Sequence, residues 1–506
     1  GRGNWETGKP SEGYQPPDLV IQDELHLLQG PLGSAVGLFE AAIEQLCTKD
    51  GLKAKIISST ATTRNTDIQI AALFNRKTNI FPKPGVQCDD SYYAFYKRHS
   101  KTPDINDAKY QSNRKYIGIL PTGKTQIWMQ MRIASIVMTH RAIYESQFSG
   151  RLGPLDFDHL APTTDVMDSY HTLISYFNSL KEVGKTQSQI QSYLLKEQRR
   201  VFNRVIRPKN LMECIYSYGP IKDAELTGRL SGEEVKNELN AVEKKWTPES
   251  RFASSVDGVM HHSNVPPDFV IATNMISVGI DVSRFNLIIM NSMPRNTAEY
   301  IQASSRVARK DKGLVITLHH PFRARDTSHY ERFRSFHCKM YSYVEPISIT
   351  PFTRKSLNRY FGLYISTIVR HLLPFHNRNS AGDILELRDS ELSEIKRFLF
   401  NYFEKRKTSM ENLPIEIRQL LKEENIRDIQ LWIEKALNSW IKTANDCIEN
   451  GETLVFNNSK SSEYSVQKSL FVGIDEYSEE LRNQNWRIPM SLRVIEPGAA
   501  LRIHSK

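Results

Sequence analysis

The chain has 506 residues, of which 40% are hydrophobic and 25% charged, a composition typical of a folded protein with two or three hydrophobic cores. Its formal net charge of +10 fits either ordinary solubility or a polyanionic partner.

No apolar run approaches the ~18 residues that a membrane-spanning helix requires, so we expect no membrane partner. Five scattered cysteines without a Cys-x-x-Cys pair argue against a zinc site or a disulfide framework and predict a reducing, cytoplasmic setting. Because the chain opens with Gly1 rather than Met, we expect it to be a piece of a longer protein.

An acidic motif follows a short apolar run near the start of the chain. Leu19–Ile21 predicts a buried strand, and Asp23, Glu24 and His26 come directly after it. A carboxylate pair at the end of such a strand suits nucleotide hydrolysis, in which one group holds Mg²⁺ and the other polarises the attacking water. The alternative is that the two acids begin a solvated helix, because acids favour helix N-termini.

A second strand is predicted after a helix at residues 36–46. It begins at Lys55 and ends in the small hydroxylated residues Ser59, Thr60 and Thr62. Small side chains at this point allow the backbone to approach a phosphate or a neighbouring motif closely. An ordinary exit from a strand into a turn favours the same residue types.

Residues 115–147 predict a strand, a turn and a helix, and the turn matches the phosphate-binding pattern G-x-x-x-x-G-K-[ST]. The matching residues are Gly118, Gly123, Lys124 and Thr125. In enzymes that pair this loop with an acidic strand end, the loop normally precedes the acids, whereas here it follows them. We therefore favour a role for Lys124 in the opening turn of a second sheet, with the phosphate loop upstream of Gly1. A phosphate loop at Gly118–Thr125 stays the alternative.

Three further strand ends carry polar residues. A strand near 172–180 exits at Asn178, and a strand end at 225–231 contains Thr227. The third strand begins at Asp268, exits at Thr273, and is followed by a turn that contains Gly279 and Asp281.

After another strand at 287–290, residues 297–309 predict a helix. Arg306 and Arg309 are three residues apart and would share a helical face, with Gln302 one turn before Arg306. Two guanidinium groups on one face suit a triphosphate, because their planar forks match phosphate oxygens. A solvated basic face is the alternative.

Arginines and aromatic residues alternate after the strand predicted at 313–318. This segment, residues 323–336, could contact the backbone and bases of a nucleic acid, or it could bury its aromatic rings in the core and leave its arginines in water. From about residue 346 the pattern changes to helices with one apolar face, such as 392–402 and 426–440.

Taken together, four stretches resemble motifs II, III, V and VI of superfamily 2 helicases, in the same order. They are Asp23–His26, Ser59–Thr62, Thr273–Asp281 and Gln302–Arg309. The resemblance implies an α/β fold with two RecA-like lobes, the first partial and the second complete, followed by a mainly helical C-terminal region. The expected segments are 1–85 for the first lobe, 86–113 for a linker, 114–345 for the second lobe and 346–506 for the helical region.

At a finer level the chain resembles the large helicase subunit of the DISARM anti-phage defence system. The similar phrases are residues 17–26, which run into 30–33, and then 176–180, 299–306 and 328–334.

The helicase resemblance implies a role for each matching residue. Asp23 would anchor Mg²⁺ through water, and Glu24 would activate the hydrolytic water. Four residues would couple hydrolysis to movement of the lobes: His26, Ser59, Thr60 and Thr62. The nucleotide would be bound by Gln302, Gly279, Asp281, Arg306 and Arg309, and nucleic acid by Thr273, Asn178 and Thr227. The chain departs from the usual motif VI by placing Ser305 and Ala308 where glycines are usual.

The predicted function is an ATP-dependent helicase or translocase that acts on DNA rather than RNA, uses ATP and Mg²⁺, and has protein partners in a defence complex. We expect hydrolysis from the parent protein and not from this chain alone. One alternative is a nucleic-acid-binding scaffold that does not hydrolyse ATP, and another is an NTPase built on Gly118–Thr125.

Overall fold

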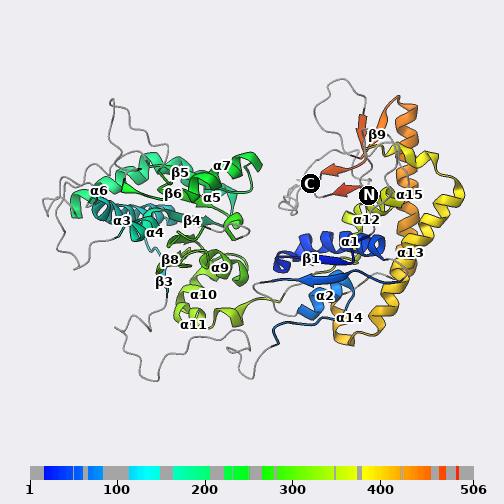
Figure 1. The fold of residues 1–506 in the computed structure, drawn as a ribbon, viewed down its shortest axis with the longest axis horizontal. Helices are drawn as coiled ribbons and strands as arrows, with labels where there is room; N and C mark the ends of the chain where they lie inside the picture. The colour runs from blue at the N-terminus through cyan, green and yellow to red at the C-terminus, as the bar shows by residue number, and fades with distance from the viewer. Residues whose placement is uncertain are drawn as a thin grey trace, which may run out of the picture. The chain divides into compact units, whose positions relative to one another are not determined.

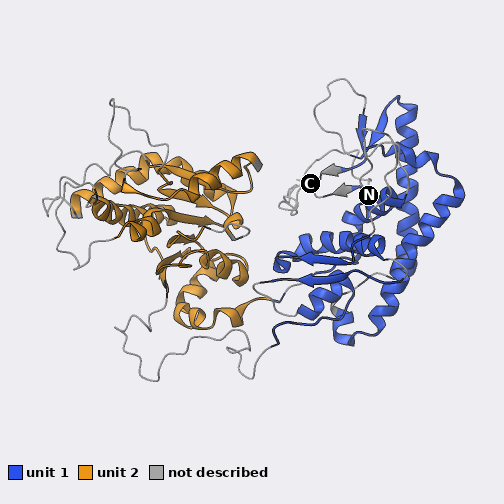
Figure 2. Ribbon diagram, in the orientation of Figure 1, with its two compact units in different colours: residues 1–94, 346–506 blue, residues 95–345 orange. Residues whose placement is uncertain are grey.

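The computed structural model forms two compact units, residues 1–94 with 346–506 (unit 1) and residues 95–345 (unit 2) (Figure 2). The residues that it describes are 16–48, 51–60, 66–83, 113–146, 148, 163–205, 221–230, 232–248, 250, 265–277, 282–346, 349–372, 379–421, 423, 425–456, 467–473 and 486–488. The linker predicted at 86–113 lies, except for its last residue, outside them.

Unit 2 is built on a six-stranded sheet in which every neighbouring pair is parallel (Figure 1). Across the sheet the strands are β3 (Arg114–Ile119), β8 (Gly313–Leu318), β7 (Leu287–Asn291), β4 (Leu173–Phe177), β6 (Phe269–Ala272) and β5 (Asp223–Leu226). All residues of β4, β6 and β7 are buried, which explains why these strands are mostly apolar in the sequence.

Helices cover both faces of this sheet. They are α3 (Gln126–Ser146), α4 (Thr164–His171), α5 (Leu180–Gln189), α6 (Leu195–Val205), α7 (Gly232–Glu243), α9 (Thr297–Ser304), α10 (Ala324–Glu331) and α11 (Phe333–Cys338), with a π-helical turn at Ile190–Leu194 between α5 and α6. One core joins Tyr176 of β4 to Tyr300 of α9, whereas another joins the next residue, Phe177, to Met131 of α3. The prediction of an α/β lobe with a parallel sheet is confirmed.

Buried ion pairs close the amino-terminal edge of the sheet. Arg141 of α3 donates to Asp268, just before β6, over 2.6 Å, and Arg284, just before β7, donates to Asp168 of α4 over 2.8 Å. Arg141, Asp268 and Arg284 are each more than nine-tenths buried. Charges buried this deeply need good partners, so these contacts fix the helices to the strand starts. The opposite, carboxyl-terminal edge is where parallel α/β sheets bind ligands.

Unit 1 begins with two parallel strands, β1 (Leu19–Gln22) and β2 (Lys55–Ser58), and the helices α1 (Gly30–Cys47) and α2 (Thr66–Phe74). The predicted strand at Leu19–Ile21 is confirmed, but its predicted burial is wrong, because Leu19 is 46% and Ile21 72% exposed. These two side chains point to the same face of the strand, and only the alternate face packs on the core.

The rest of unit 1 is mainly helical, as predicted. Its helices are α12 (Arg354–Leu372), α13 (Asp389–Glu411), α14 (Ile415–Leu421) and α15 (Ile426–Glu449), and its short strands pair as β9 (Thr453–Val455) with β10 (Gln467–Ser469) and β11 (Val472–Gly473) with β12 (Arg487–Ile488). In the described part of the chain, no helix combines the length and apolar character needed to cross a bilayer.

The helical region shares a core with the first segment of the chain. Leu38 of α1 packs in one cluster with Tyr364 of α12, and the Tyr364 hydroxyl donates to the side chain of Gln45 over 2.7 Å. Arg406 of α13 donates to the carbonyl of Ala72 at the end of α2 over 3.1 Å. Residues 346–506 are therefore packed together with β1, β2 and their helices, whereas the sequence patterns indicate two separate regions.

Candidate functional site

The predicted motifs II and III meet at the carboxyl ends of β1 and β2. Because the two strands are parallel and adjacent, Asp23 and Ser59 emerge side by side, and the Ser59 hydroxyl donates to the Asp23 carboxylate. Two backbone bonds lock this junction, from Ser59 N–H to the carbonyl of Gln22 and from Leu25 N–H to the carbonyl of Ser59, both 2.9 Å. The structure thus brings together two of the predicted site stretches that lie 36 residues apart in the sequence.

Asp23 is exposed and held in its charged form. The hydrogen bond from Ser59, followed by one from the backbone N–H of Glu24, lowers the pKa of the Asp23 carboxyl. A lone carboxylate with a free face suits Mg²⁺, which commonly keeps several water ligands and takes others from nucleotide phosphates. Within the described residues, no group of three or more His, Cys, Asp and Glu is placed to hold a metal ion.

Glu24 adopts a left-handed backbone conformation with φ of 54°, which is uncommon for a residue with a side chain. Such backbone strain persists only where the surroundings enforce it. Here the next residue, Leu25, is buried and its N–H is bonded to Ser59, and these two contacts hold Glu24 in the left-handed conformation. The tight turn places Oε2 of Glu24 at 3.3 Å from Nδ1 of His26. His26 is only 5% exposed, and the same nitrogen lies 3.4 Å from Oγ1 of Thr60. A line of polar contacts thus runs from Glu24 through His26 to Thr60.

Three of the predicted site residues lie outside the described residues, namely Thr62, Gly279 and Asp281.

The prediction of one helix through Arg309 is wrong at its carboxyl end, because α9 ends at Ser304. Ala308 has a φ of 61°, which a right-handed helix does not permit, and its N–H donates to the Phe285 carbonyl over 3.1 Å. Arg114 of β3 holds the turn after the helix, because its guanidinium donates to the carbonyl of Val307 over 3.0 and 3.1 Å and to that of Ser305, the C-cap residue, over 3.4 Å.

Gln302, Arg306 and Arg309 consequently do not form a stripe on one helix. Gln302 lies on α9 and is mostly buried, Arg306 is half-buried in the turn after it, and Arg309 is exposed. Ala308 occupies the left-handed position at which motif VI usually has glycine, at a cost of about 1 kcal/mol.

The three residues predicted to bind nucleic acid differ in exposure. Asn178 is exposed directly after β4, and its side-chain NH₂ donates to the carbonyl of Asn291 over 3.2 Å, which orients the amide. Thr273 is mostly buried, whereas the next residue, Asn274, is exposed. Thr227 is fully buried and donates its hydroxyl to Glu225, so its side chain is not at the surface.

The G-x-x-x-x-G-K-[ST] match does not form a single loop. Gly118 lies inside β3, paired with Thr317, and a Cβ atom there would come within 2.6 Å of the Phe333 ring. Lys124 is exposed, with its ammonium 5.5 Å from the centre of the Trp128 ring, and the Thr125 hydroxyl accepts the Trp128 N–H over 3.3 Å. Packing against Phe333 explains the first glycine, and capping of α3 explains the threonine.

Replacing Gly118 by alanine is expected to lower the free energy of unfolding by about 1–3 kcal/mol, because the new methyl group overlaps Phe333. Urea-induced unfolding measures this loss, and ATP titration of the folded variant measures affinity. A phosphate loop at this position predicts the reverse, with lost ATP affinity and little change in stability. Gly184, where an added Cβ meets no atom within 4 Å, provides the control substitution.

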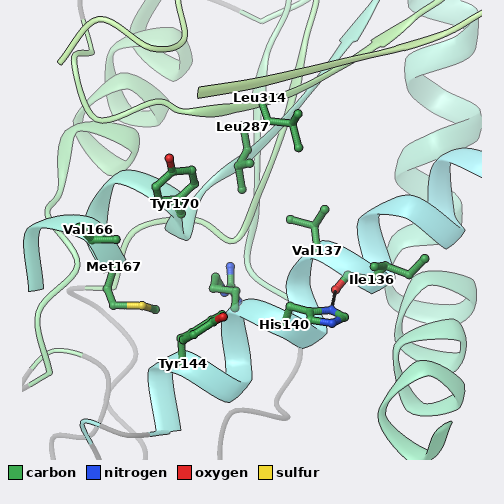
Figure 3. Close-up of a pocket in the computed structure, with 10 residues that line it drawn as sticks. Ile136, Val137, His140, Tyr144, Val166, Met167, Tyr170, Leu287 and Leu314 are labelled. Atoms are coloured by element: carbon green, nitrogen blue, oxygen red, sulfur yellow. Dashed lines mark hydrogen bonds between the residues drawn. The ribbon is translucent and has the colours of Figure 1, made fainter. Parts of the chain in front are cut away.

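An apolar cavity of about 520 Å³ lies between α3 and α4 (Figure 3). It is lined by Val137 and Tyr144 of α3, Met167 of α4, and Leu287 and Leu314 near the starts of β7 and β8. This is the amino-terminal side of the sheet, opposite the edge at which Asn178, Thr273 and Lys124 lie. His140, Arg141 and Tyr170 also line the cavity, but nearly all of its lining surface is apolar.

Comparison with known proteins gives two sequence similarities. Residues 257–311, which include β6, β7 and α9, match the family described as Helicase conserved C-terminal domain. The chain is 30% identical over 499 residues, 97% of its length, to the DISARM protein DrmA of Bacillus paralicheniformis, of which it spans 38%. This similarity confirms the resemblance to a DISARM helicase subunit.

Among solved structures, the DUF1998 helicase MrfA bound to DNA is 13% identical, with a TM-score of 0.42 over 69% of this chain and 35% of that chain. The Mycobacterium smegmatis helicase Lhr bound to ssDNA and AMP-PNP is 12% identical, with a TM-score of 0.39 over 78% of this chain and 37% of that chain. The sequence similarities are the informative ones: by them the chain is a homologue of the DISARM protein DrmA, and its residues 257–311 match the helicase conserved C-terminal domain.

Proposed function

We propose that the chain supplies the catalytic carboxylates and the second lobe of an ATP-dependent helicase or translocase that moves on nucleic acid, DNA rather than RNA. The observation that carries the proposal is the junction of β1 and β2, where Asp23 is bonded to Ser59 and where Glu24, His26 and Thr60 lie in contact. The similarity to DrmA and the match to a helicase domain support it.

In this proposal Asp23 and Glu24 have different tasks. Mg²⁺ bound together with ATP supplies positive charge at the β- and γ-phosphates. The Asp23 carboxylate, kept ionised by Ser59, would hold that ion through water. The Glu24 carboxylate accepts a proton from the attacking water, which is general-base catalysis. Because Thr60 contacts His26 and His26 contacts Glu24, a shift of the strand end at Thr60 changes the position of the base.

In the same proposal, unit 2 supplies further side chains that contact the nucleotide and the nucleic acid. Arg306 and Arg309 would stabilise the charge that develops on the γ-phosphate, assisted by Gln302, Gly279 and Asp281. Asn178 and Thr273 would contact the phosphate backbone, a contact that positions a strand without reading its sequence. By its similarity to a DISARM protein, we propose that the whole protein works in the cytoplasm with protein partners in anti-phage defence.

DNA-stimulated ATP hydrolysis by the full-length protein tests the proposal. We expect single-stranded DNA to raise turnover and Arg306→Ala to lower it by about 10³-fold, as for other catalytic arginines. Lys124→Ala is expected to leave turnover at saturating DNA near wild type. Lys310→Ala, which removes an exposed charge next to Arg309, is the matched control.

Two results contradict this proposal in different ways. Loss of turnover in Lys124→Ala with full turnover in Arg306→Ala assigns hydrolysis to a phosphate loop at Gly118–Thr125. Salt-dependent DNA binding without any hydrolysis identifies a scaffold.

A further inference from the structure

The loops that follow β3 and β8 lie side by side, because these two strands are paired along their whole length. Together they enclose a concavity of about 650 Å³ at the carboxyl-terminal edge of the unit 2 sheet, which we call the β3–β8 hollow. Its lining combines rings and a positive charge: Pro121, Lys124, Trp128, Pro321 and Phe322.

Phe322 leaves its ring open to solvent while its backbone is held in place. The side chain is 91% exposed, and its N–H donates to Nδ1 of His320 over 3.2 Å. The neighbouring aromatic, Trp128, is half-buried on α3 and carries the Lys124 ammonium over its face. A single exposed phenylalanine is ordinary on a protein surface, so the argument depends on what surrounds it.

The surroundings are positively charged. Five basic side chains are exposed in the loops and helix starts that follow β3, β4 and β8: Lys124, Lys181, Lys185, Arg323 and Arg325. The acids of the same edge are engaged within the protein. Glu182 accepts from Arg323, Asp326 is buried and accepts from the Met293 N–H, and Glu299 accepts from Tyr176. This edge therefore attracts an anion rather than a cation.

A second, polar hollow of about 360 Å³ lies at the same edge, and Thr125 lines both hollows. The second is also lined by Lys185, Asn291 and Arg323, and by Glu182, which accepts from Arg323. Asn291 is the residue whose carbonyl orients Asn178. A path at the carboxyl-terminal edge thus runs from Asn178, a proposed backbone contact, to Phe322.

We propose that the β3–β8 hollow is a subsite for single-stranded nucleic acid, in which the Phe322 ring stacks on a base and Lys124 contacts a phosphate. Aromatic rings beside a basic groove are how proteins hold single strands without reading sequence, because every base has a stacking face. This subsite rests on the proposed function, since it extends the path of the strand that the translocase holds.

The test is fluorescence anisotropy of two labelled probes bound to the full-length protein: oligodeoxythymidylate, and an abasic strand of equal length that has phosphates but no bases. Phe322→Ala is expected to weaken binding of the oligodeoxythymidylate about tenfold and to leave the abasic strand unchanged, and Phe322→Trp to restore wild-type affinity. Lys124→Gln is expected to weaken both probes and to reduce the salt dependence by about one phosphate contact. Tyr341→Ala, at another exposed aromatic of unit 2, is the control.

The outcomes separate the subsite from the function on which it rests. If the wild-type protein binds neither probe, the proposed function fails. If it binds both but Phe322→Ala loses no affinity for oligodeoxythymidylate, the stacking subsite is overturned and the nucleic-acid function stands. Equal weakening of both probes by Phe322→Ala also overturns stacking, because it shows a loss of loop structure rather than of a base contact.

Discussion

Replacing Glu24 by glutamine is expected to lower the rate of DNA-stimulated ATP hydrolysis by about 10²–10⁴-fold, the usual contribution of a general base. Glutamine has the shape of glutamate, and its side-chain amide can keep a contact with His26, but it does not accept a proton from water. Affinity for ATP should therefore stay near wild type. Single-turnover hydrolysis and equilibrium binding of a labelled ATP analogue, measured on the full-length protein, separate these two quantities.

Asp18 provides the control for this substitution. It is an exposed carboxylate directly before β1, at the opposite end of the strand from Glu24. Asp18→Asn removes the same charge and should leave turnover unchanged. Wild-type turnover in Glu24→Gln would remove Glu24 from the chemistry, and a loss of ATP binding in that variant would assign it to nucleotide binding instead.

The sheet of unit 2 was predictable because its strands are buried on both faces. β4, β6 and β7 are buried on both faces, so each is a mostly apolar run with a polar residue at or directly after its end, and this pattern stands out in the sequence. The same logic overestimated the burial of β1. Leu19 and Ile21 belong to an equally apolar run, yet their face of the strand is open, and the residues alone do not show which faces are covered.

The carboxyl end of α9 was not predictable from local preference. Alanine has the highest helix propensity, so Ala308 reads as a helical residue, but its left-handed backbone is imposed by bonds to Phe285 and Asn286 from the neighbouring strand region. Gly313 is the other half of this arrangement, since a Cβ there would lie 2.7 Å from the Cβ of Ala308. Tertiary contacts thus override propensity at the segment that carries both predicted catalytic arginines.

The contact line of Glu24, His26 and Thr60 was partly predictable. The helicase resemblance named all three residues, but the left-handed turn at Glu24 that brings its carboxylate to His26 depends on a bond between Leu25 and Ser59. The sequence did not indicate that Phe322 is exposed, because nothing in the pattern distinguishes it from the nearby Phe333 and Phe336. Their difference lies in packing, because Phe336 is buried and Phe333 covers Gly118, while Phe322 is exposed.

Arg406 ties the helical region to the start of the chain, and its replacement by methionine is expected to lower the free energy of unfolding of unit 1 by about 3–5 kcal/mol. The guanidinium is 1% exposed, lies 4.0 Å over the Phe352 ring, and donates to Glu423 over 2.6 Å. It also donates to the carbonyls of Ala71 and Ala72 in the last turn of α2. Methionine fills much of the volume but leaves these carbonyls and Glu423 without that donor.

Hydrogen exchange shows which helices the substitution destabilises, and urea unfolding measures by how much. Arg406→Met should speed amide exchange in α2 and α13 together and leave the β3–β8 strands of unit 2 unchanged, while urea unfolding gives the total loss. Arg397→Met, at an exposed arginine of the same helix, is the matched control and should change stability by no more than about 0.5 kcal/mol. If exchange rises in α13 alone, Arg406 stabilises only its own helix. If exchange rises in both helices, the helical region stabilises α2, which follows the strand end at Ser59 and Thr60. Loss of that support would then destabilise the proposed catalytic carboxylates through the core of unit 1.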